Sequence, residues 1–236
     1  MSVNVVLSFL VELILQSLAN IFELNNSFKD VVILSLYVSV IATIISSVIS
    51  IYLTSYMAIK NFFGKDAITL IFNSLMSLPP VVVGLILYVT FSSSGVLGFM
   101  DLLYSPNIMI IAQFIIVTPI IISLSLKCLN DRYSLLSDYL FSLNTSENKI
   151  RRTLVYESRY DLLIIVITGM SRALSEVGAV IIVGGNIDNL TRVMTTSIVL
   201  ETSRGELSLA LSLGISLIVI AITMNLLISY IKNKLL

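Results

Sequence analysis

An arginine and a glutamate, Arg172 and Glu176, stand four positions apart at the start of the mostly apolar stretch RALSEVGAVIIVGGN, residues 172–186. At this spacing both side chains share one helix face and can pair, which lowers the cost of charge in an apolar phase. The pair could serve only to hold a helix in place. Alternatively its face, with Ser175, could border an anion path, where Arg172 gives a transient counter-charge and Glu176 prevents tight trapping. As a third possibility Glu176 could be a catalytic base, although the sequence shows no second catalytic group.

The same stretch ends in Gly184, Gly185 and Asn186. A turn of this composition can offer free backbone N–H groups to an anion, which would place these residues at the path or its gate. It can equally be a plain helix stop with glycine just after the last turn. The seven-residue stretch MTTSIVL, residues 194–200, is too short to cross a membrane, so residues 184–206 are expected to form a short helix over the outer mouth.

The composition places these side chains in an integral membrane protein. The chain has 236 residues, of which 57% are hydrophobic and 12% charged, and its mean hydropathy is +1.01. The absence of histidine excludes a histidine-ligated metal site and histidine acid–base chemistry. No phosphate-binding P-loop motif occurs, and a net charge of zero gives no sign of a nucleic-acid surface. The single cysteine, Cys128, cannot form an internal disulfide.

Five apolar segments are long enough to cross a bilayer, which takes about 20 residues. The fold is therefore predicted to be all-α, with spans near residues 31–58, 67–91, 107–126, 160–183 and 207–231. Polar residues recur every fourth position in residues 1–24, which indicates an amphipathic helix lying at the interface, with a sixth span as the alternative.

Prolines interrupt two of these spans. Pro79 and Pro80 remove two backbone donors near the middle of the second span, so a helix break is expected there. Pro119 lies at a similar depth in the third span. These prolines could be packing kinks, or they could mark discontinuous helices that line a pathway, as in transporters.

The basic residues predict the orientation, because lysine and arginine concentrate on the cytoplasmic side. If the loop 127–159 is cytoplasmic, ten of the fourteen basic residues lie inside. With five spans, the N-terminus is then outside and the C-terminus inside. The ten residues are Lys60, Lys65, Lys127, Arg132, Lys149, Arg151, Arg152, Arg159, Lys232 and Lys234.

The loop 127–159 is too apolar for a solvated linker. Leu136, Leu140 and Leu143 align on one helical face, and Asn144 with Glu147 reads as an N-cap with its capping-box partner. Two short helices meeting at Asn144 are therefore expected. Their apolar face requires a partner, which could be the protein's own spans or a groove in another subunit.

The segment SDYLFSLNTSENKIRRTLVYE resembles the E-A-A-x-x-x-G loop of ABC importer permeases, which inserts into a cleft of the ATP-hydrolysing subunit. On this resemblance Asp138 takes the acidic position of that loop, Tyr139 and Leu140 take the two alanine positions, and Asn144 takes the glycine position. Asparagine is one of the few residues that tolerate the left-handed turn for which the glycine would be needed. The docking residues implied are Asp138, Tyr139, Leu140, Leu143 and Asn144.

Two longer segments, LMSLPPVVVGLILYVTFSSSGVLG and residues 171–214, narrow the resemblance to tungstate-type permeases, close to the molybdate permeases. The similarity covers residues 28–231, which would be a type I importer transmembrane domain behind an N-terminal helix, residues 1–27. It implies a homodimer in a prokaryotic plasma membrane, with ATP and Mg²⁺ on a separate ATP-binding subunit, an extracytoplasmic substrate-binding protein and no cofactor on this chain. Tungstate is the implied substrate, and molybdate, sulfate, phosphate and vanadate stay open. The alternative from a different class is a self-sufficient channel or intramembrane enzyme.

Overall fold

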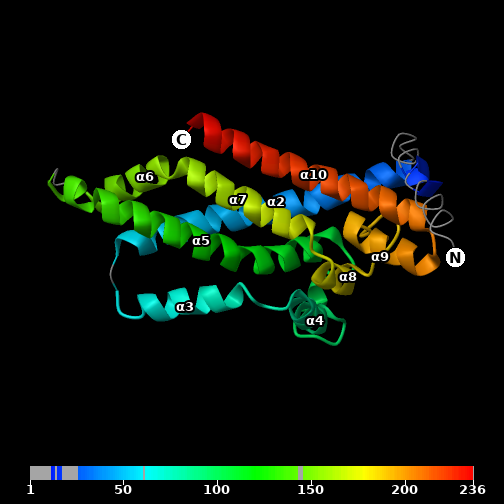
Figure 1. Ribbon diagram of the computed structural model, residues 1–236. Coiled ribbons are helices and arrows are strands. Elements are labelled where there is room, and N and C mark those ends of the chain that lie inside the picture. Colours follow the sequence, from blue (N-terminus) through cyan, green and yellow to red (C-terminus); the bar gives the residue numbers. More distant parts are fainter. Residues whose placement is uncertain (1–11, 14, 18–25, 61, 143–145, 236) are drawn as a thin grey trace.

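The computed structural model describes residues 12–13, 15–17, 26–60, 62–142 and 146–235. Every regular element within these residues is a helix, which confirms the predicted all-α class (Figure 1). The elements are α2 (Asn26–Ile59), α3 (Lys65–Leu75), α4 (Pro80–Phe91), the 3₁₀ turn η1 (Gly98–Met100), α5 (Pro106–Ser142), α6 (Glu147–Glu157), α7 (Arg159–Leu174), α8 (Gly178–Gly184), α9 (Met194–Arg204) and α10 (Leu207–Leu235).

Three helices in the described part of the chain are long and apolar enough to span a membrane, namely Phe28–Ile59, Pro106–Ser137 and Leu207–Tyr230. Two more candidates are bent pairs, α3 with α4 at 96° and α7 with α8 at 57°. If each bent pair is one span, the count reaches the five predicted. The second and fourth predicted spans, 67–91 and 160–183, are thus broken helices.

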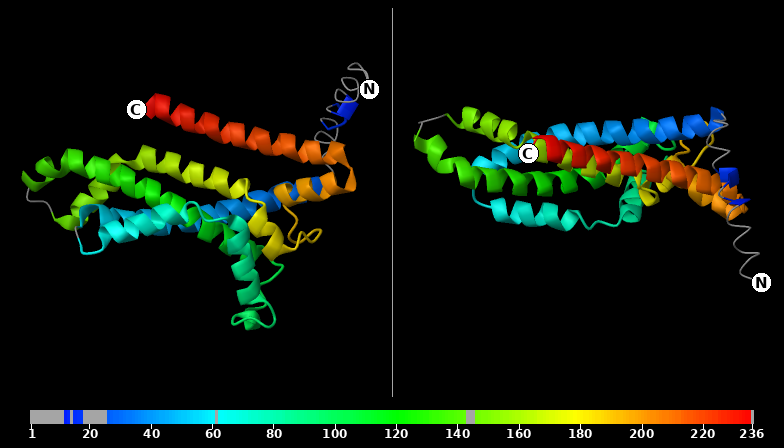
Figure 2. Two further views of the ribbon diagram at one scale, coloured as in Figure 1. Left: turned by 60° about the horizontal axis from the view of Figure 1, so that its bottom comes forward. Right: turned by 45° about the horizontal axis from the view of Figure 1, so that its top comes forward.

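The centre of the bundle is the pair α2 and α5, which lie side by side along most of their length (Figures 1 and 2). The face of α2 toward α5 carries small hydroxyl residues, and Ser46 Oγ lies 2.9 Å from Thr118 Oγ1 of α5. Small side chains let two helices approach closely in an apolar phase, where their hydroxyls satisfy one another. The two central helices therefore form the rigid frame on which the bent pairs rest.

Helix α5 differs from the prediction in two ways. It continues through Pro119 without a break, so the interpretation of Pro119 as the site of a discontinuous helix is wrong. It also continues to Ser142, far into the predicted loop 127–159, so the first of the two short helices expected there is the extension of a span. A periodic apolar pattern shows a helix but not whether it is joined to the preceding one.

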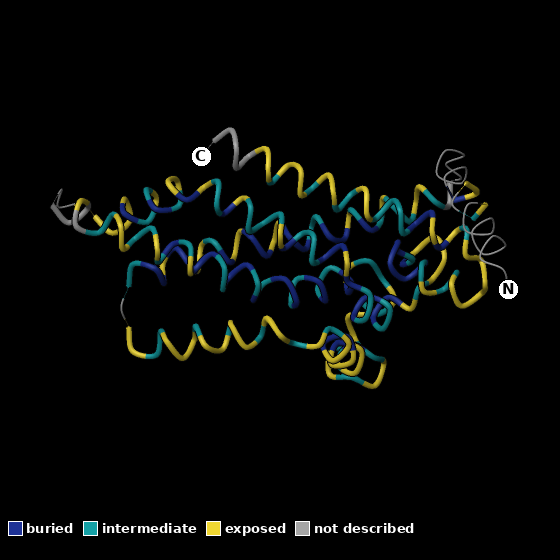
Figure 3. The backbone as a smooth tube through the Cα atoms, in the orientation of Figure 1, coloured by how far each residue is buried: buried dark blue, intermediate teal, exposed yellow. Residues whose placement is uncertain are grey.

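The outer helices carry much of the exposed apolar surface (Figure 3). Helix α3 buries none of its residues, and in the apolar window of α10 only 17% of residues are buried, against 61% in α5. Apolar side chains turned outward on whole helices are the pattern of a protein that meets lipid or a partner subunit.

The N-terminal segment is described only at residues 12–13 and 15–17, which are helical. Ser17 is buried there: its hydroxyl donates to the Ser208 carbonyl at 3.0 Å, and Ser212 Oγ donates to the Ser17 carbonyl at 3.0 Å. This segment thus contacts the start of α10. Most of the predicted amphipathic helix lies outside the described residues, and the division at residues 27 and 28 stays a prediction.

Candidate functional site

The chemically distinctive residues meet where α7 ends and α8 begins. Arg172 lies in the last turn of α7, Glu176 lies between the two helices, and the chain bends there by 57°. The sequence predicted one continuous span over residues 160–183. The structure instead places the arginine and the glutamate on either side of the end of α7. They lie at a break, and the bend leaves backbone groups there that other elements must satisfy.

The predicted ion pair between Arg172 and Glu176 is present. Arg172 Nη1 donates to Glu176 Oε2 at 2.7 Å. The side chain of Glu176 is 3% exposed and that of Arg172 is 36% exposed, so the carboxylate is buried and the guanidinium is half open. Ser175 donates back to the Arg172 carbonyl at 3.0 Å and takes no part in the pair.

Glu176 also holds the break together through two further bonds. Its Oε1 accepts from the backbone N–H of Ala179 in the first turn of α8 at 3.3 Å. Its own carbonyl accepts from Thr195 Oγ1 of α9 at 2.8 Å. One residue thus connects the end of α7, the start of α8 and α9. Its observed role in the structure is to fasten three helix ends.

A buried glutamine completes this junction from α5. Gln113, 4% exposed, donates through Nε2 to the Ala173 carbonyl at 3.1 Å. Its Oε1 is buried and has no partner among the described residues. Sequence analysis did not single out Gln113 or Thr195. A lone amide within an apolar span is a signal that could have indicated Gln113, whereas nothing in the sequence separates Thr195 from the other threonines of α9.

The second broken pair meets the first through a close helix crossing. The predicted break at Pro79 and Pro80 is confirmed: Pro79 is the N-cap of α4 and Pro80 its first residue, after a 96° bend from α3. Helix α4 then crosses α8 where Gly84 faces Ala179. A Cβ built on Gly84 would lie 2.8 Å from the Ala179 Cα, so only glycine fits there.

The glycine turn after α8 is a helix stop. Gly185 has a φ of 69° and its N–H bonds to the Ile181 carbonyl at 3.0 Å. Thr191 Oγ1 donates to the Gly184 carbonyl at 2.6 Å and accepts the Ile187 N–H at 2.9 Å. The N–H groups of Gly185 and Ile187 are thus bonded within the chain, which favours the interpretation of this turn as a helix stop.

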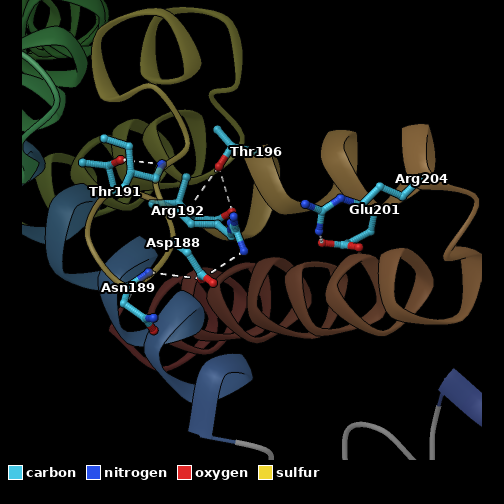
Figure 4. A network of polar contacts seen from close by, with 9 residues as sticks. Asp188, Asn189, Thr191, Arg192, Thr196, Glu201 and Arg204 are labelled. Carbon is cyan, nitrogen blue, oxygen red and sulfur yellow. Dashed lines mark hydrogen bonds and ion pairs between the residues drawn. The ribbon is translucent and has the colours of Figure 1, made fainter.

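The loop after this turn leads into α9, the predicted short helix (Figure 4). Arg192 pairs with Asp188 at 2.9 Å, and Arg204 pairs with Glu201 at 3.3 Å. The N–H of Met194 donates to Ser35 Oγ of α2 at 2.7 Å, which anchors the start of α9 in the bundle. The helix that carries Thr195 to Glu176 is thus itself held in place.

The predicted docking loop lies at the opposite end of the bundle from α9 (Figure 1). Leu135 and Tyr139 on the last turns of α5 are 76% and 65% exposed. Asp138 and Leu140 lie on the same helix, but their side chains are outside the described part. Leu143 and Asn144 are outside the described residues altogether.

The second half of that loop, α6, packs on the protein's own bundle. Ile150 and Leu154 are buried against Met57 of α2 and Leu129 of α5. Helix α6 begins at Glu147 with Ser146 at its N-cap position, and Ser146 makes no side-chain capping bond. Glu147 is thus the first residue of the helix and pairs with Lys60 at 3.4 Å, so the predicted capping box, with Glu147 three residues after the cap, is wrong. A hydrogen bond with Tyr56 and then the charge of Glu147 raise the pKa of Lys60.

In the part of the chain that the structure describes, three long apolar helices and two bent helix pairs define a multi-pass helical membrane protein, and broken helices of this kind are typical of transporters. No family model matches the sequence. Known relatives do. The chain is 40% identical to the tungstate uptake system permease protein of Peptoclostridium acidaminophilum, over 83% of this chain and 86% of that protein. It is 34% identical to a probable anion ABC transporter permease protein of Haloferax volcanii, over 81% and 84% of the two chains.

A third relative, the tungstate uptake system permease protein of Campylobacter jejuni, is 40% identical over 68% of this chain and 67% of its own length. The chain therefore belongs to the family of ABC transporter permeases for oxyanion import. It is a transport subunit and not an enzyme, which removes the interpretation of Glu176 as a catalytic base.

Proposed function

We propose that this permease takes up tungstate. The observation that carries the proposal is the 40% identity to two tungstate uptake permeases from different genera. Tungstate and molybdate share one tetrahedral shape and charge, so a pathway in the membrane can hardly distinguish them. Selection among tungstate, molybdate, sulfate, phosphate and vanadate would then reside in the binding protein that delivers the anion.

The proposed assembly has two copies of this chain in the plasma membrane, with the N-terminus outside and the C-terminus inside. Each copy docks one ATP-binding subunit, which carries ATP and Mg²⁺, and an extracytoplasmic substrate-binding protein meets the outer face. The exposed apolar side chains at the end of α5, Leu135 and Tyr139, support docking there. Helix α6 is packed on α2 and α5. A movement of the docked ATP-binding subunit would therefore be transmitted through α6 to these two central helices.

In this proposal the two residues of the ion pair have separate roles. Glu176 is the fastening residue, since it is buried and bonded to three helix ends. Arg172 keeps part of its guanidinium exposed and would meet the passing oxyanion, while the carboxylate weakens that contact enough for release. Ser175 then acts through the backbone geometry at the break, and the glycine turn ends α8, without either of them binding the anion.

Uptake measurements test the substrate. Cells that express this chain with its ATP-binding and substrate-binding partners should accumulate tungsten, measured by elemental mass spectrometry, above cells that lack the chain. Molybdate, sulfate, phosphate or vanadate is added in separate arms at a concentration equal to that of tungstate. Accumulation that sulfate or phosphate abolishes at equimolar concentration would contradict tungstate as the substrate.

Co-purification tests the docking surface. Leu135→Asp changes a side chain that is 76% exposed, so we expect the protein to stay folded and to lose its ATP-binding subunit. Val96→Asp, at an equally open position of 87% exposure in the loop after α4, is the matched control and should keep the complex. Retention of the ATP-binding subunit by the Leu135→Asp protein would remove this surface from the proposal.

Thiol labelling at Ser134, the residue before Leu135, tests the orientation of the loop. In a Cys128→Ser background, a cysteine at the exposed Ser134 should react with an impermeant thiol reagent only after the membrane is opened. Labelling in intact cells would place the loop outside and contradict the proposed topology.

A further inference from the structure

A groove on the outer side of α2 combines an apolar floor with two guanidinium groups at one end. It has a volume of about 480 Å³ and is lined by α2 and α6. Val48, Ile51 and Tyr52 contribute from α2, and Arg151, Arg152 and Val155 from α6. The oxyanion path proposed above does not use any of these residues.

The apolar part of the groove continues along one face of α2. Ile44, Val48, Tyr52 and Tyr56 follow one another at four-residue intervals, with exposed fractions of 56%, 66%, 65% and 46%. Residues four apart lie above one another on a helix, so these side chains form a continuous stripe. The stripe lies within the membrane-spanning part of α2, Phe28–Ile59. It is long enough, at about 18 Å, to lie along much of one acyl chain.

The charged end of the groove is arranged to receive an anion. The Arg151 guanidinium carbon lies 5.2 Å from the centre of the Tyr52 ring and 5.9 Å from that of Tyr56, which restrains the guanidinium beside the stripe. Within the described residues neither Arg151 nor Arg152 forms a salt bridge, although five such bridges occur elsewhere in that part of the chain. A guanidinium group that is not paired with a carboxylate is suited to bind a phosphate group.

We propose that this groove binds an anionic phospholipid of the phosphatidylglycerol class, with its phosphate on Arg151 and Arg152 and one acyl chain along Ile44, Val48 and Tyr52. Such a lipid supplies a phosphate and an apolar chain in the order in which the groove presents its charged end and its stripe. The basic end lies beside Tyr52 and Tyr56, in the last turns of the candidate span Phe28–Ile59, where lipid head groups are expected. The bound lipid would brace α6 against α2, next to the buried contacts of Ile150 and Leu154.

Native mass spectrometry of the purified protein tests the site. The protein is titrated in detergent with phosphatidylglycerol or with phosphatidylcholine, and the bound lipid is counted. We expect preferential retention of phosphatidylglycerol, and we expect the double variant Arg151→Gln, Arg152→Gln to bind it about thirtyfold more weakly. The matched control is Lys29→Gln, Arg204→Gln, which removes two positive charges at the other end of the bundle and should bind like the parent.

A second double variant keeps the proposal testable if the glutamine variant does not fold. Arg151→Lys, Arg152→Lys keeps both charges but loses the planar donors, so it should retain phosphatidylglycerol at an intermediate affinity. Equal retention of both lipids by the parent, or unchanged phosphatidylglycerol binding in the glutamine variant, would overturn the proposal. So would loss of the homodimer or of the ATP-binding subunit in the glutamine variant with lipid binding intact, because the groove would then be a protein interface.

Inorganic phosphate separates a lipid site from a general anion site. Phosphate added at the same concentration should not displace phosphatidylglycerol, because it cannot occupy the apolar stripe. Full displacement would show that the guanidinium pair binds free anions and that the stripe contributes nothing, which also overturns the proposal.

Discussion

The two broken helix pairs bend for different physical reasons. Between α3 and α4 the chain turns by 96° at Pro79 and Pro80, whose missing N–H groups end one helix and start the next. Between α7 and α8 it turns by 57° at residues 175–177, where no proline occurs. There the bend is held by Glu176, with Gln113 of α5 and Thr195 of α9 satisfying the opened backbone.

The α3–α4 break is marked by a local sequence feature and the α7–α8 break by tertiary contacts. Different substitutions are therefore expected to disrupt them. The first break is favoured locally by two adjacent prolines, and the packing of α4 on α8 also holds it. The second exists only while side chains from three helices meet at it. Since α4 and α8 cross at Gly84 and Ala179, the two breaks are also joined, and a change at one is passed to the other.

The largest expected effect is on the tertiary break. Arg172→Gln leaves the carboxylate of Glu176, 3% exposed, without its charge partner and should lower the free energy of unfolding by about 3 kcal/mol. Glu176→Gln should cost less, about 1 to 2 kcal/mol, because the arginine left behind is 36% exposed and can reach water or head groups. Chemical unfolding in detergent measures both values.

Combining the two changes sharpens this result. In the double variant the charges are gone together, so its loss of stability should be smaller than the sum of the two single losses. Additive losses would show that the 2.7 Å contact carries no coupling energy.

Uptake by the Arg172→Gln protein, with assembly verified, tests whether Arg172 contacts the oxyanion in the transport path. Unchanged transport would remove that role.

A smaller effect is expected where the breaks meet. Gly84→Ala puts a Cβ 2.8 Å from the Ala179 backbone, which forces α4 from α8 and should cost about 2 kcal/mol. Gly214→Ala in α10 is the control, since nothing lies within 4 Å of its added Cβ. That control should gain about 0.5 to 1 kcal/mol from the lower flexibility of the unfolded chain. Equal unfolding midpoints for the two variants would argue against the close crossing.

The smallest effect is expected at the prolines themselves. Pro79→Ala with Pro80→Ala should cost about 1 kcal/mol, because the unfolded chain becomes more flexible while α4 stays anchored on α8. Spin labels at the exposed positions Leu70 and Val89 then measure whether the bend survives. We expect an unchanged distance distribution. A longer distance would show that the prolines alone hold the bend and that the α4–α8 crossing does not.

Much of the fold could be predicted from the sequence. The apolar segments gave the spans, Pro79 and Pro80 gave one break, and the four-residue spacing of Arg172 and Glu176 gave the ion pair. The bend at residues 175–177 was missed because the apolar pattern continues through it. The length of α5 and the true N-cap of α6, Ser146, were missed because periodicity does not show where two helices join.

The predicted docking residues stay a prediction, and the structure describes the side chain of only one of them, Tyr139. Tyr139 is exposed at the end of α5, while the side chains of Asp138 and Leu140 and the whole of Leu143 and Asn144 lie outside the described residues. Sequence reasoning left open whether this loop packs on its own bundle or on a partner. In the structure the two halves of the loop differ. Helix α6 packs on the bundle through Ile150 and Leu154, whereas the end of α5 keeps an apolar surface exposed.

By itself the sequence determined that this chain is a helical membrane protein, where its spans lie and which two charged residues pair, because hydropathy, proline and helical spacing act over a few neighbouring residues. Only the tertiary structure decided that Glu176 is buried at a bend, that Gln113 and Thr195 complete it, and that Gly84 must stay small. Those properties depend on which distant helices meet at a point, and no local pattern encodes the partner of a buried polar group.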